Sequence, residues 1–249
     1  MIDIKDISKQ LQASSTIPSP DALEKMMGYV RCYIFPELYR DVLPSTAAAI
    51  IADILTKHTT EPVEGFIDCL PEIKRLVLTD LVAIAENDPA VTSLAEIVYA
   101  YPAITVMIHY RFAHALIEAG IPLLPRMITE MAHSKTGIDI HPAAKIGEYF
   151  AIDHGTGIVI GATTIIGNHV MLYQGVTLGA KNFHYDENGL PIDQPRHPIL
   201  EDNVTVYSNA SILGNVRIGH DTVVGGNVWL THSVPPHSRI LQSTAVEVR

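Results

Sequence analysis

The chain has few cysteines and little basic charge. Only Cys32 and Cys69 occur in 249 residues, without a CxxC pair, so the sequence predicts neither a disulfide scaffold nor a cysteine metal centre. The 17 Lys and Arg residues are scattered and are outnumbered by 27 Asp and Glu residues, which gives a formal net charge of -10. This balance argues against nucleic acid as a partner.

Long apolar runs are also missing from the sequence. No stretch approaches the roughly 20 apolar residues that a membrane-spanning helix needs, and the first residues lack the basic start and apolar core of a signal peptide. We therefore expect a cytoplasmic protein with no membrane partner. The apolar share of 47% is still ample for a buried core.

The first half of the chain has the apolar spacing of α-helices. From about residue 20 to residue 133, apolar residues recur three and four positions apart, as in Leu43, Ala47, Ile50 and Ile54. The pattern predicts an α-helical domain over residues 1–136 with about five or six helices. Breaks between helices are expected at Pro62 and Gly65, Pro71, Asn87-Asp88-Pro89, Tyr101-Pro102 and Gly120-Ile121-Pro122.

Beyond residue 138 the apolar period changes to six. A helix would spread such a period around its surface, and an ordinary strand would alternate every second residue. One series holds large aliphatics and a second, four places later, holds small or β-branched residues. The large series is Leu200, Val206, Ile212, Ile218, Val224 and Leu230; the small series is Val204, Ala210, Val216, Thr222, Val228 and Val234; earlier series are Ile140, Ile146, Ile152, Ile158 and, shifted by two, Ile160, Ile166, Leu172, Leu178.

The six-residue period predicts a parallel β-helix over residues 137–249, in which each coil has three flat sides and one inward aliphatic per side. The chain as a whole is then an α+β protein. Residues 179–198 interrupt the repeat, and their turn-forming and charged residues predict a functional loop that leaves the coil. Glycines are expected at tight corners that favour a residue without a Cβ, namely Gly147, Gly161, Gly167, Gly214 and Gly219.

Four short motifs stand on this frame: DIHPAAKIG from Asp139, DHGTGIVIG from Asp153, YQGVTLGA from Tyr173 and RHP from Arg196. Through them the chain resembles the serine acetyltransferase family over residues from about 80 to 238. The resemblance implies a left-handed β-helix of hexapeptide repeats that assembles as a homotrimer or a dimer of trimers. It also implies transfer of acetyl from the co-substrate acetyl-CoA to the hydroxyl of L-serine, giving O-acetylserine for cysteine biosynthesis.

The resemblance also assigns the catalytic dyad. His154 corresponds to the general base and Asp139 to the carboxylate that pairs with it. The chemistry suits these residue types, because an alcohol needs an aligned base and a histidine titrates near neutral pH. A carboxylate on the far ring nitrogen would fix the tautomer and stabilise the imidazolium. Without the resemblance, the Asp153-His154 pair could equally be a solvated turn.

The remaining roles follow the same resemblance. Asp153 and Asp88 would hold the serine ammonium, and Arg196 with His197 would meet its carboxylate, which the guanidinium fork fits. Asp88 also reads as an ordinary turn before Pro89. Acetyl-CoA would make main-chain contacts at Ala180 and Ser208, with the amide of Ala180 stabilising the oxyanion.

Other readings stay open at this stage. The same scaffold could acetylate a sugar or an amine, or could only assemble with a partner without catalysis. His141, His169 and His220 could in principle bind zinc, but they lack paired spacing, so no metal is expected and His141 is expected to pack or bond locally.

The chain departs from the family pattern in its long interruption, in VYSNAS around Ser208, and after Pro236. It ends Val248-Arg249, whereas family members that dock into O-acetylserine sulfhydrylase finish with isoleucine, so that partnership is not expected.

Overall fold

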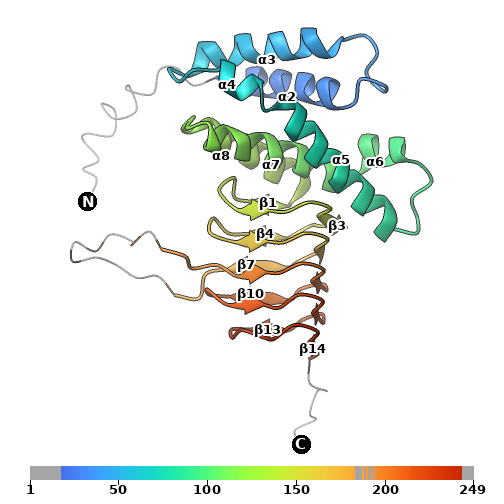
Figure 1. The fold of residues 1–249 in the computed structure, drawn as a ribbon, viewed down its shortest axis with the longest axis vertical. Helices are drawn as coiled ribbons and strands as arrows, with labels where there is room; N and C mark the ends of the chain where they lie inside the picture. Colours follow the sequence, from blue (N-terminus) through green and yellow to red (C-terminus); the bar gives the residue numbers. More distant parts are fainter. Residues whose placement is uncertain (1–17, 183–186, 188, 190–191, 193, 243–249) are drawn as a thin grey trace, which may run out of the picture.

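The computed structural model describes residues 18–182, 187, 189, 192 and 194–242. Its N-terminal part is helical and packs on one end of a stack of β coils (Figure 1). Among the described helices, none is long and apolar enough to cross a membrane. The helices are α2 (Pro20–Ile34), α3 (Pro44–His58), α4 (Glu64–Ile67), α5 (Leu70–Asn87), α6 (Leu94–Ala100), α7 (Pro102–Glu118) and α8 (Leu124–Thr136).

The expected breaks at Asn87-Asp88-Pro89, Tyr101-Pro102 and Gly120-Ile121-Pro122 agree with the structure. The break between α2 and α3 was not expected from the sequence, and Gly65 lies inside the short helix α4. Pro71 does not separate two helices, because it lies in the first turn of α5, where the missing N–H has no partner to lose. Helix α8 ends at Thr136 with Gly137 in the left-handed conformation, and the first strand begins at Asp139. The division into two domains at residue 136 remains a prediction.

The C-terminal part is a β-solenoid of three parallel sheets, as the six-residue period predicts. We call them sheets A, B and C in the order in which the chain meets them. Sheet A holds β1 (Asp139–Ile140), β4 (Val159–Ile160), β7 (Thr177–Gly179), β10 (Ser211–Leu213) and β13 (Trp229–Leu230); sheet B holds β2 (Lys145–Ile146), β5 (Ile165–Ile166), β8 (Ile199–Leu200) and β11 (Arg217–Ile218); sheet C holds β3 (Ala151–Asp153), β6 (Met171–Tyr173), β9 (Thr205–Val206), β12 (Val223–Val224) and β14 (Arg239–Ile240).

The aliphatic series fills the inside of the solenoid. Leu200, Val206 and Ile212 are fully buried, as are the equivalent residues of the coils on either side. The two-residue shift in the series has a structural cause: Ile140 pairs with Ile160 and not with Ile158. The first coil is therefore two residues longer than the six-residue rule requires. The extra residues fall in the corner that follows β3, where His154 lies.

The corner glycines are needed because successive coils approach closely. A Cβ on Gly167 would lie 2.3 Å from Asp202 Oδ1, and one on Gly219 would lie 2.3 Å from the nitrogen of Pro236. Neither glycine has a positive φ. Gly147 and Gly161 are crowded in the same way, so the preference for a residue without a Cβ is confirmed at these four corners by the neighbouring coil. Gly214 differs, because its φ is 95 and a Cβ there would lie 3.2 Å from Lys181 Cβ.

One buried ion pair joins the helices to the first coil. Arg111 on α7 donates two hydrogen bonds to Asp80 on α5, each 2.9 Å long. Its remaining donors reach the carbonyls of Ile146 and Gly147, and Asp80 accepts the N–H of Phe150. Both charged side chains are almost fully buried. This ion pair thus fixes α5 and α7 against the first coil. As a result, the end of α5 lies beside the His154 corner.

Candidate active site

The first group of predicted site residues lies on the corner between sheets C and A. We call it the His154 corner and define it by Asp88, Tyr101, Asp153 and His154. His154 sits in the left-handed conformation with φ 56, and its side chain is 73% exposed. Its Nε2 lies 3.8 Å from Asp153 Oδ1. The longer corner therefore presents an accessible imidazole beside a carboxylate.

Asp88 reaches this corner from the helical part. It caps the C-terminus of α5, and its Oδ1 accepts the N–H of Ala90 at 2.8 Å. Its Oδ2 accepts the hydroxyl of Tyr101 at 2.7 Å. The Tyr101 hydrogen bond is the largest cause that lowers the pKa of Asp88, and the nearby charge of His154 lowers it further. Asp88 thus has a local capping role and also faces the candidate base.

Tyr101 belongs to this corner through a contact with Asp88 that the sequence did not reveal. Its hydrogen bond to Asp88 raises the Tyr101 pKa to about 12, so the phenol stays a donor at neutral pH. The charge of Asp153 contributes to the same rise. Nothing in the dipeptide Tyr101-Pro102 signals more than a break between helices. Only the folded positions of α5 and α6 bring the phenol to the carboxylate.

The second group lies on the corner between sheets A and B. We call it the Arg196 corner and define it by His141, Thr163, Arg196 and His197. Thr163 Oγ1 accepts the backbone N–H of Arg196 at 2.9 Å and that of His197 at 3.1 Å. The end of the 179–198 loop is thereby fixed to the corner after β4. Nothing in the sequence distinguished Thr163, which lies two residues after Gly161 in the same corner.

His197 is held neutral by its surroundings. Its Nδ1 accepts the N–H of Thr163 at 3.2 Å, so the ring proton of the neutral form belongs on Nε2. Burial, followed by the charges of Arg196 and His141, lowers its pKa to about 4. The ring lies over Gly161, where a Cβ would approach His197 Cδ2 to 2.0 Å. His197 is therefore a fixed polar group that carries no charge at neutral pH.

The position of Asp139 leaves the predicted dyad with His154 untested. Asp139 begins β1 in sheet A, and its carboxylate lies within 4.8 Å of ligand atoms of Glu130 and His133. Across the described residues, no hydrogen bond links Asp139 to His154. The predicted dyad remains a prediction.

The two predicted acetyl-CoA contacts fall on different corners. Ser208 lies on the same corner as His154, where the N–H of Asn227 bonds to its carbonyl at 2.9 Å. Ala180 follows β7 on the side of the Arg196 corner. Within one chain, the two predicted acetyl-CoA contacts therefore lie on different corners. The predicted serine contacts are split between the same two corners.

The three histidines that could in principle bind zinc each make a separate local contact. His141 Nδ1 accepts the N–H of Ala143, His169 stacks on Tyr149 at 4.5 Å, and His220 contacts Asp221. They form no common cluster in the described part of the chain. The local role expected for His141 is confirmed.

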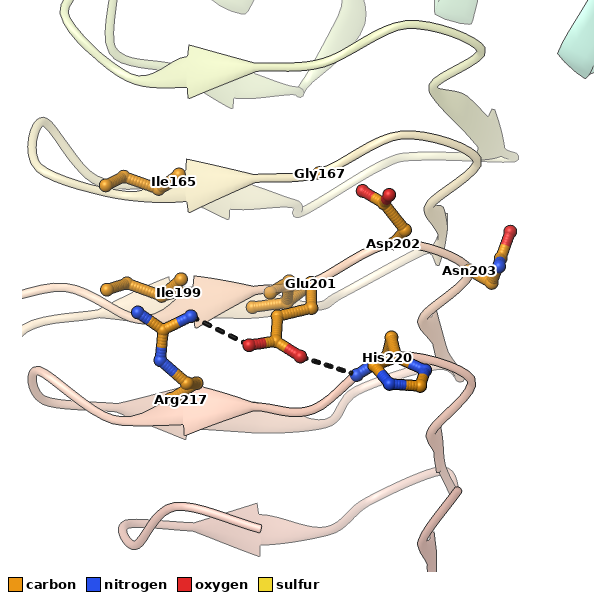
Figure 2. A pocket seen from close by; sticks show the side chains of 9 residues that line it. Ile165, Gly167, Ile199, Glu201, Asp202, Asn203, Arg217 and His220 are labelled. Carbon is orange, nitrogen blue, oxygen red and sulfur yellow. Dashed lines mark hydrogen bonds and ion pairs between the residues drawn. The ribbon is translucent and has the colours of Figure 1, made fainter. Parts of the chain in front are cut away.

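One hollow of about 180 Å³ on the outer surface adjoins the Arg196 corner, because Arg196 is among its lining residues. Figure 2 shows another, of about 490 Å³, along sheet B, lined by residues including Ile165, Ile199 and Arg217. Polar groups that line it bond to one another, since Glu201 accepts hydrogen bonds from Arg217 and from the backbone N–H of His220. Neither predicted half of the serine site opens into it.

Three comparisons relate the chain to known proteins. The family described as Bacterial transferase hexapeptide (six repeats) matches residues 197–232. A plasmid serine acetyltransferase of Synechococcus elongatus is 46% identical over 224 residues, which are 90% of this chain and 70% of that relative.

Solved structures of serine acetyltransferases are also similar to this chain. Serine acetyltransferase 1 of Entamoeba histolytica, in complex with L-cysteine, is 35% identical with a TM-score of 0.78, covering 87% of this chain and 86% of the other. A serine acetyltransferase in complex with CoA is 26% identical with a TM-score of 0.64, covering 86% of this chain and 79% of the other.

Proposed function

The chain belongs to the serine acetyltransferase family, and from this membership we propose that its two corners form one active site shared between neighbouring copies. The protein is an acetyl-CoA-dependent O-acetyltransferase that acts on L-serine. What is proposed concerns the residues that perform the reaction and the assembly that completes the site.

Acetyl transfer requires a base that removes the proton of the serine hydroxyl. In the proposed mechanism His154 removes the proton from the serine hydroxyl as its oxygen attacks the thioester carbonyl of acetyl-CoA. The tetrahedral intermediate collapses with cleavage of the C–S bond, and the imidazolium returns the proton to the CoA thiolate. Transfer is direct, without an acyl-enzyme. Asp139 is proposed to hold the far ring nitrogen and stabilise the imidazolium.

Serine binding is assigned to charges on both corners. The carboxylates of Asp88 and Asp153 flank His154 and suit an ammonium group beside the reacting hydroxyl. Arg196 suits the substrate carboxylate because its planar fork can donate two parallel hydrogen bonds. His197 adds a neutral donor next to it. These assignments place the hydroxyl between the two charged ends of the amino acid, against the base.

The acetyl-CoA contacts are assigned to the backbone. Ser208 lies on the corner of His154, so the pantetheine arm is proposed to follow this edge of the solenoid toward the base. The amide of Ala180, from the opposite corner, is proposed to donate to the developing oxyanion. Both contacts use main-chain groups, which tolerate the departures of the side chains from the family pattern.

A homotrimer would bring the corners together. In one chain the His154 and Arg196 corners lie at opposite ends of the short strands of sheet A, separated by roughly 15–20 Å for a side of about six residues. In a cyclic assembly, one corner of each copy meets the other corner of the next. Pairing of two trimers through the N-terminal helices remains a further prediction.

The observation that carries this proposal is the meeting of Asp88, Asp153 and His154 at one corner. The test is release of CoA thiol from acetyl-CoA with serine, homoserine or a sugar as acceptor. We expect serine to be preferred. His154→Asn keeps a residue that tolerates the positive φ, and its kcat is expected to fall by about 10²- to 10⁴-fold.

His169→Asn is the matched control, because His169 has the same φ of 56 on another corner. It is expected to retain normal turnover. A preference for a sugar over serine would contradict the proposed substrate. Normal turnover in His154→Asn would contradict the proposed base even if serine is the substrate.

A further inference from the structure

The corner between sheets B and C carries a regular column of side chains. Each coil places one residue there in the left-handed conformation, and successive corners are linked by backbone hydrogen bonds, as from the N–H of His237 to the carbonyl of His220. Coil stacking thus sets residues distant in sequence about 4.8 Å apart. The left-handed residues of the column are Tyr149, His169, Asn203, Asp221 and His237.

Near the C-terminal end of the column, three side chains converge. His220 Nδ1 lies 2.7 Å from Asp221 Oδ2, and His237 Nδ1 lies 3.6 Å from the same oxygen. The rings of His220 and His237 meet edge to face at 4.9 Å. Two imidazole nitrogens and one carboxylate oxygen therefore lie within 4.8 Å of one another.

These separations match the ligand shell of a transition-metal ion. Nitrogen and oxygen ligands at about 2.0–2.2 Å from a tetrahedral zinc ion stand roughly 3.3–3.5 Å from each other. The distances from Asp221 Oδ2 to His220 Nδ1, 2.7 Å, and to His237 Nδ1, 3.6 Å, lie on either side of this range. Imidazole donors favour zinc and its first-row neighbours over calcium or magnesium, which prefer oxygen.

Neighbouring groups hold the three side chains in place. Asn203 donates to the second carboxylate oxygen of Asp221 at 3.1 Å. Glu201 accepts the backbone N–H of His220 at 3.0 Å and is itself paired with Arg217 at 2.8 Å, as Figure 2 shows. Such outer contacts orient metal ligands and raise affinity.

We propose that His220, Asp221 and His237 bind one divalent transition-metal ion such as Zn²⁺ at the C-terminal end of the solenoid. The ion would replace the His220–Asp221 hydrogen bond with three ligand bonds and leave its remaining positions to water. His237 belongs to the last described coil, whose strand β14 pairs on one side only, with β12. The bound ion therefore ties the end coil to the coil above it.

This site is separate from the proposed reaction. It lies on the corner between sheets B and C, whereas the His154 and Arg196 corners flank sheet A. We expect the ion to stabilise the protein without being required for acetyl transfer.

The experiment compares the full-length metal-free protein with two variants by calorimetric titration with ZnCl₂. Asp221→Asn and His237→Asn retain a residue that this chain itself uses at left-handed corners, as at Asn203 and Asn227, so the fold is preserved. His232→Asn is the control, an exposed histidine near His237 that lies outside the cluster. Absorption of bound Co²⁺ gives an independent measure of the ligand geometry.

The expected result is one high-affinity Zn²⁺ per chain. Asp221→Asn and His237→Asn should each weaken it by about 10-fold or more, with no change in His232→Asn. The thermal midpoint should rise with Zn²⁺ in the unsubstituted protein and less in the two variants. The proposal is overturned if the variants bind Zn²⁺ as tightly as the unsubstituted protein, or if no stoichiometric binding occurs.

Discussion

Single side chains at the His154 corner serve both the local fold and the proposed chemistry. Asp88 caps α5 through its backbone N–H, which donates to the carbonyl of Ile84. Its Oδ1 accepts the N–H of Ala90, and its Oδ2 accepts the hydroxyl of Tyr101. A carboxylate held at both oxygens is oriented before serine arrives, so less ordering remains to be done on binding. Tyr101 is in this sense a positioning residue for Asp88.

Removing the Tyr101 hydroxyl tests this arrangement. In Tyr101→Phe the pKa of Asp88 rises, because the hydrogen bond that contributes most to its lowering is lost. We expect the KM for serine to rise several-fold with little change in kcat. The rise should grow as the pH falls toward the new pKa, where the carboxylate becomes protonated and no longer attracts the ammonium.

Steady-state kinetics between pH 4 and 8 would measure the effect, because the lower limit approaches the ordinary carboxyl pKa of 3.8. Tyr99→Phe is the matched control, because Tyr99 on α6 donates only to the carbonyl of Leu38. An unchanged serine KM in Tyr101→Phe at every pH would contradict the positioning role.

At the scale of elements, the contact between α5, α7 and the first coil depends on Asp80 and Arg111. Both charges are buried, and each is satisfied by the other and by backbone groups. Removing the charge of one partner leaves the other charge buried without compensation. The resulting loss in the free energy of unfolding is far larger than the net contribution of the pair.

Asp80→Asn should therefore lower the free energy of unfolding by about 3–5 kcal/mol. Urea unfolding followed by circular dichroism would measure it. The control is Asp53→Asn, which breaks an exposed pair with Lys57 on α3 and should cost less than about 0.5 kcal/mol. Equal losses in the two variants would show that the buried pair has no special role.

The elements themselves were readable from the sequence because their periods are regular. Repetition every six residues predicts the solenoid. The two-residue shift before Ile160 is visible in the sequence, but its cause, the longer corner, follows only from the pairing of Ile140 with Ile160. The sequence assigned the wrong role to Pro71, because a proline that begins a helix and one that ends a helix look alike without neighbouring contacts.

Contacts between elements could not be read in this way. Asp80 and Arg111 lie on separate helices with ordinary surrounding residues, so nothing local distinguishes them from surface charges. The same holds for Tyr101 at Asp88 and for His237 beside Asp221. These pairs depend on how helices and coils stack, which a one-dimensional period does not specify.

For the whole molecule, two buried histidines predict a loss of stability in acid. His109 on α7 is 6% exposed, and burial lowers its pKa to about 4. Burial also lowers the pKa of His197 to about 4. Since the ordinary value is 6.5, the unfolded chain binds more protons between these two values. The stabilisation is complete above pH 6.5 and is lost as the pH falls toward 4.

At pH 5, proton binding to His109 in the unfolded chain should cost about 2 kcal/mol. The free energy of unfolding in urea should therefore fall between pH 7.5 and pH 5, and fall less in His109→Gln. The exposed His232→Gln should behave as the unsubstituted protein does. An equal pH dependence in all three proteins would contradict the argument for His109.

The shared active site is the main claim about the assembled molecule. It predicts that two inactive variants can restore each other, because His154 and Arg196 of one site come from different copies. In a trimer mixed at random from equal amounts of His154→Asn and Arg196→Gln chains, about a quarter of the sites contain both intact corners.

Co-expression of the two variants with different affinity tags, followed by isolation of the mixed assemblies, tests this claim most directly. Acetyl transfer to serine would be measured against each variant alone and against the unsubstituted protein. Because every isolated mixed trimer contains one site of three with both corners intact, the account predicts recovery to about a third of the unsubstituted activity. Mixed assemblies no more active than the separate variants would contradict it.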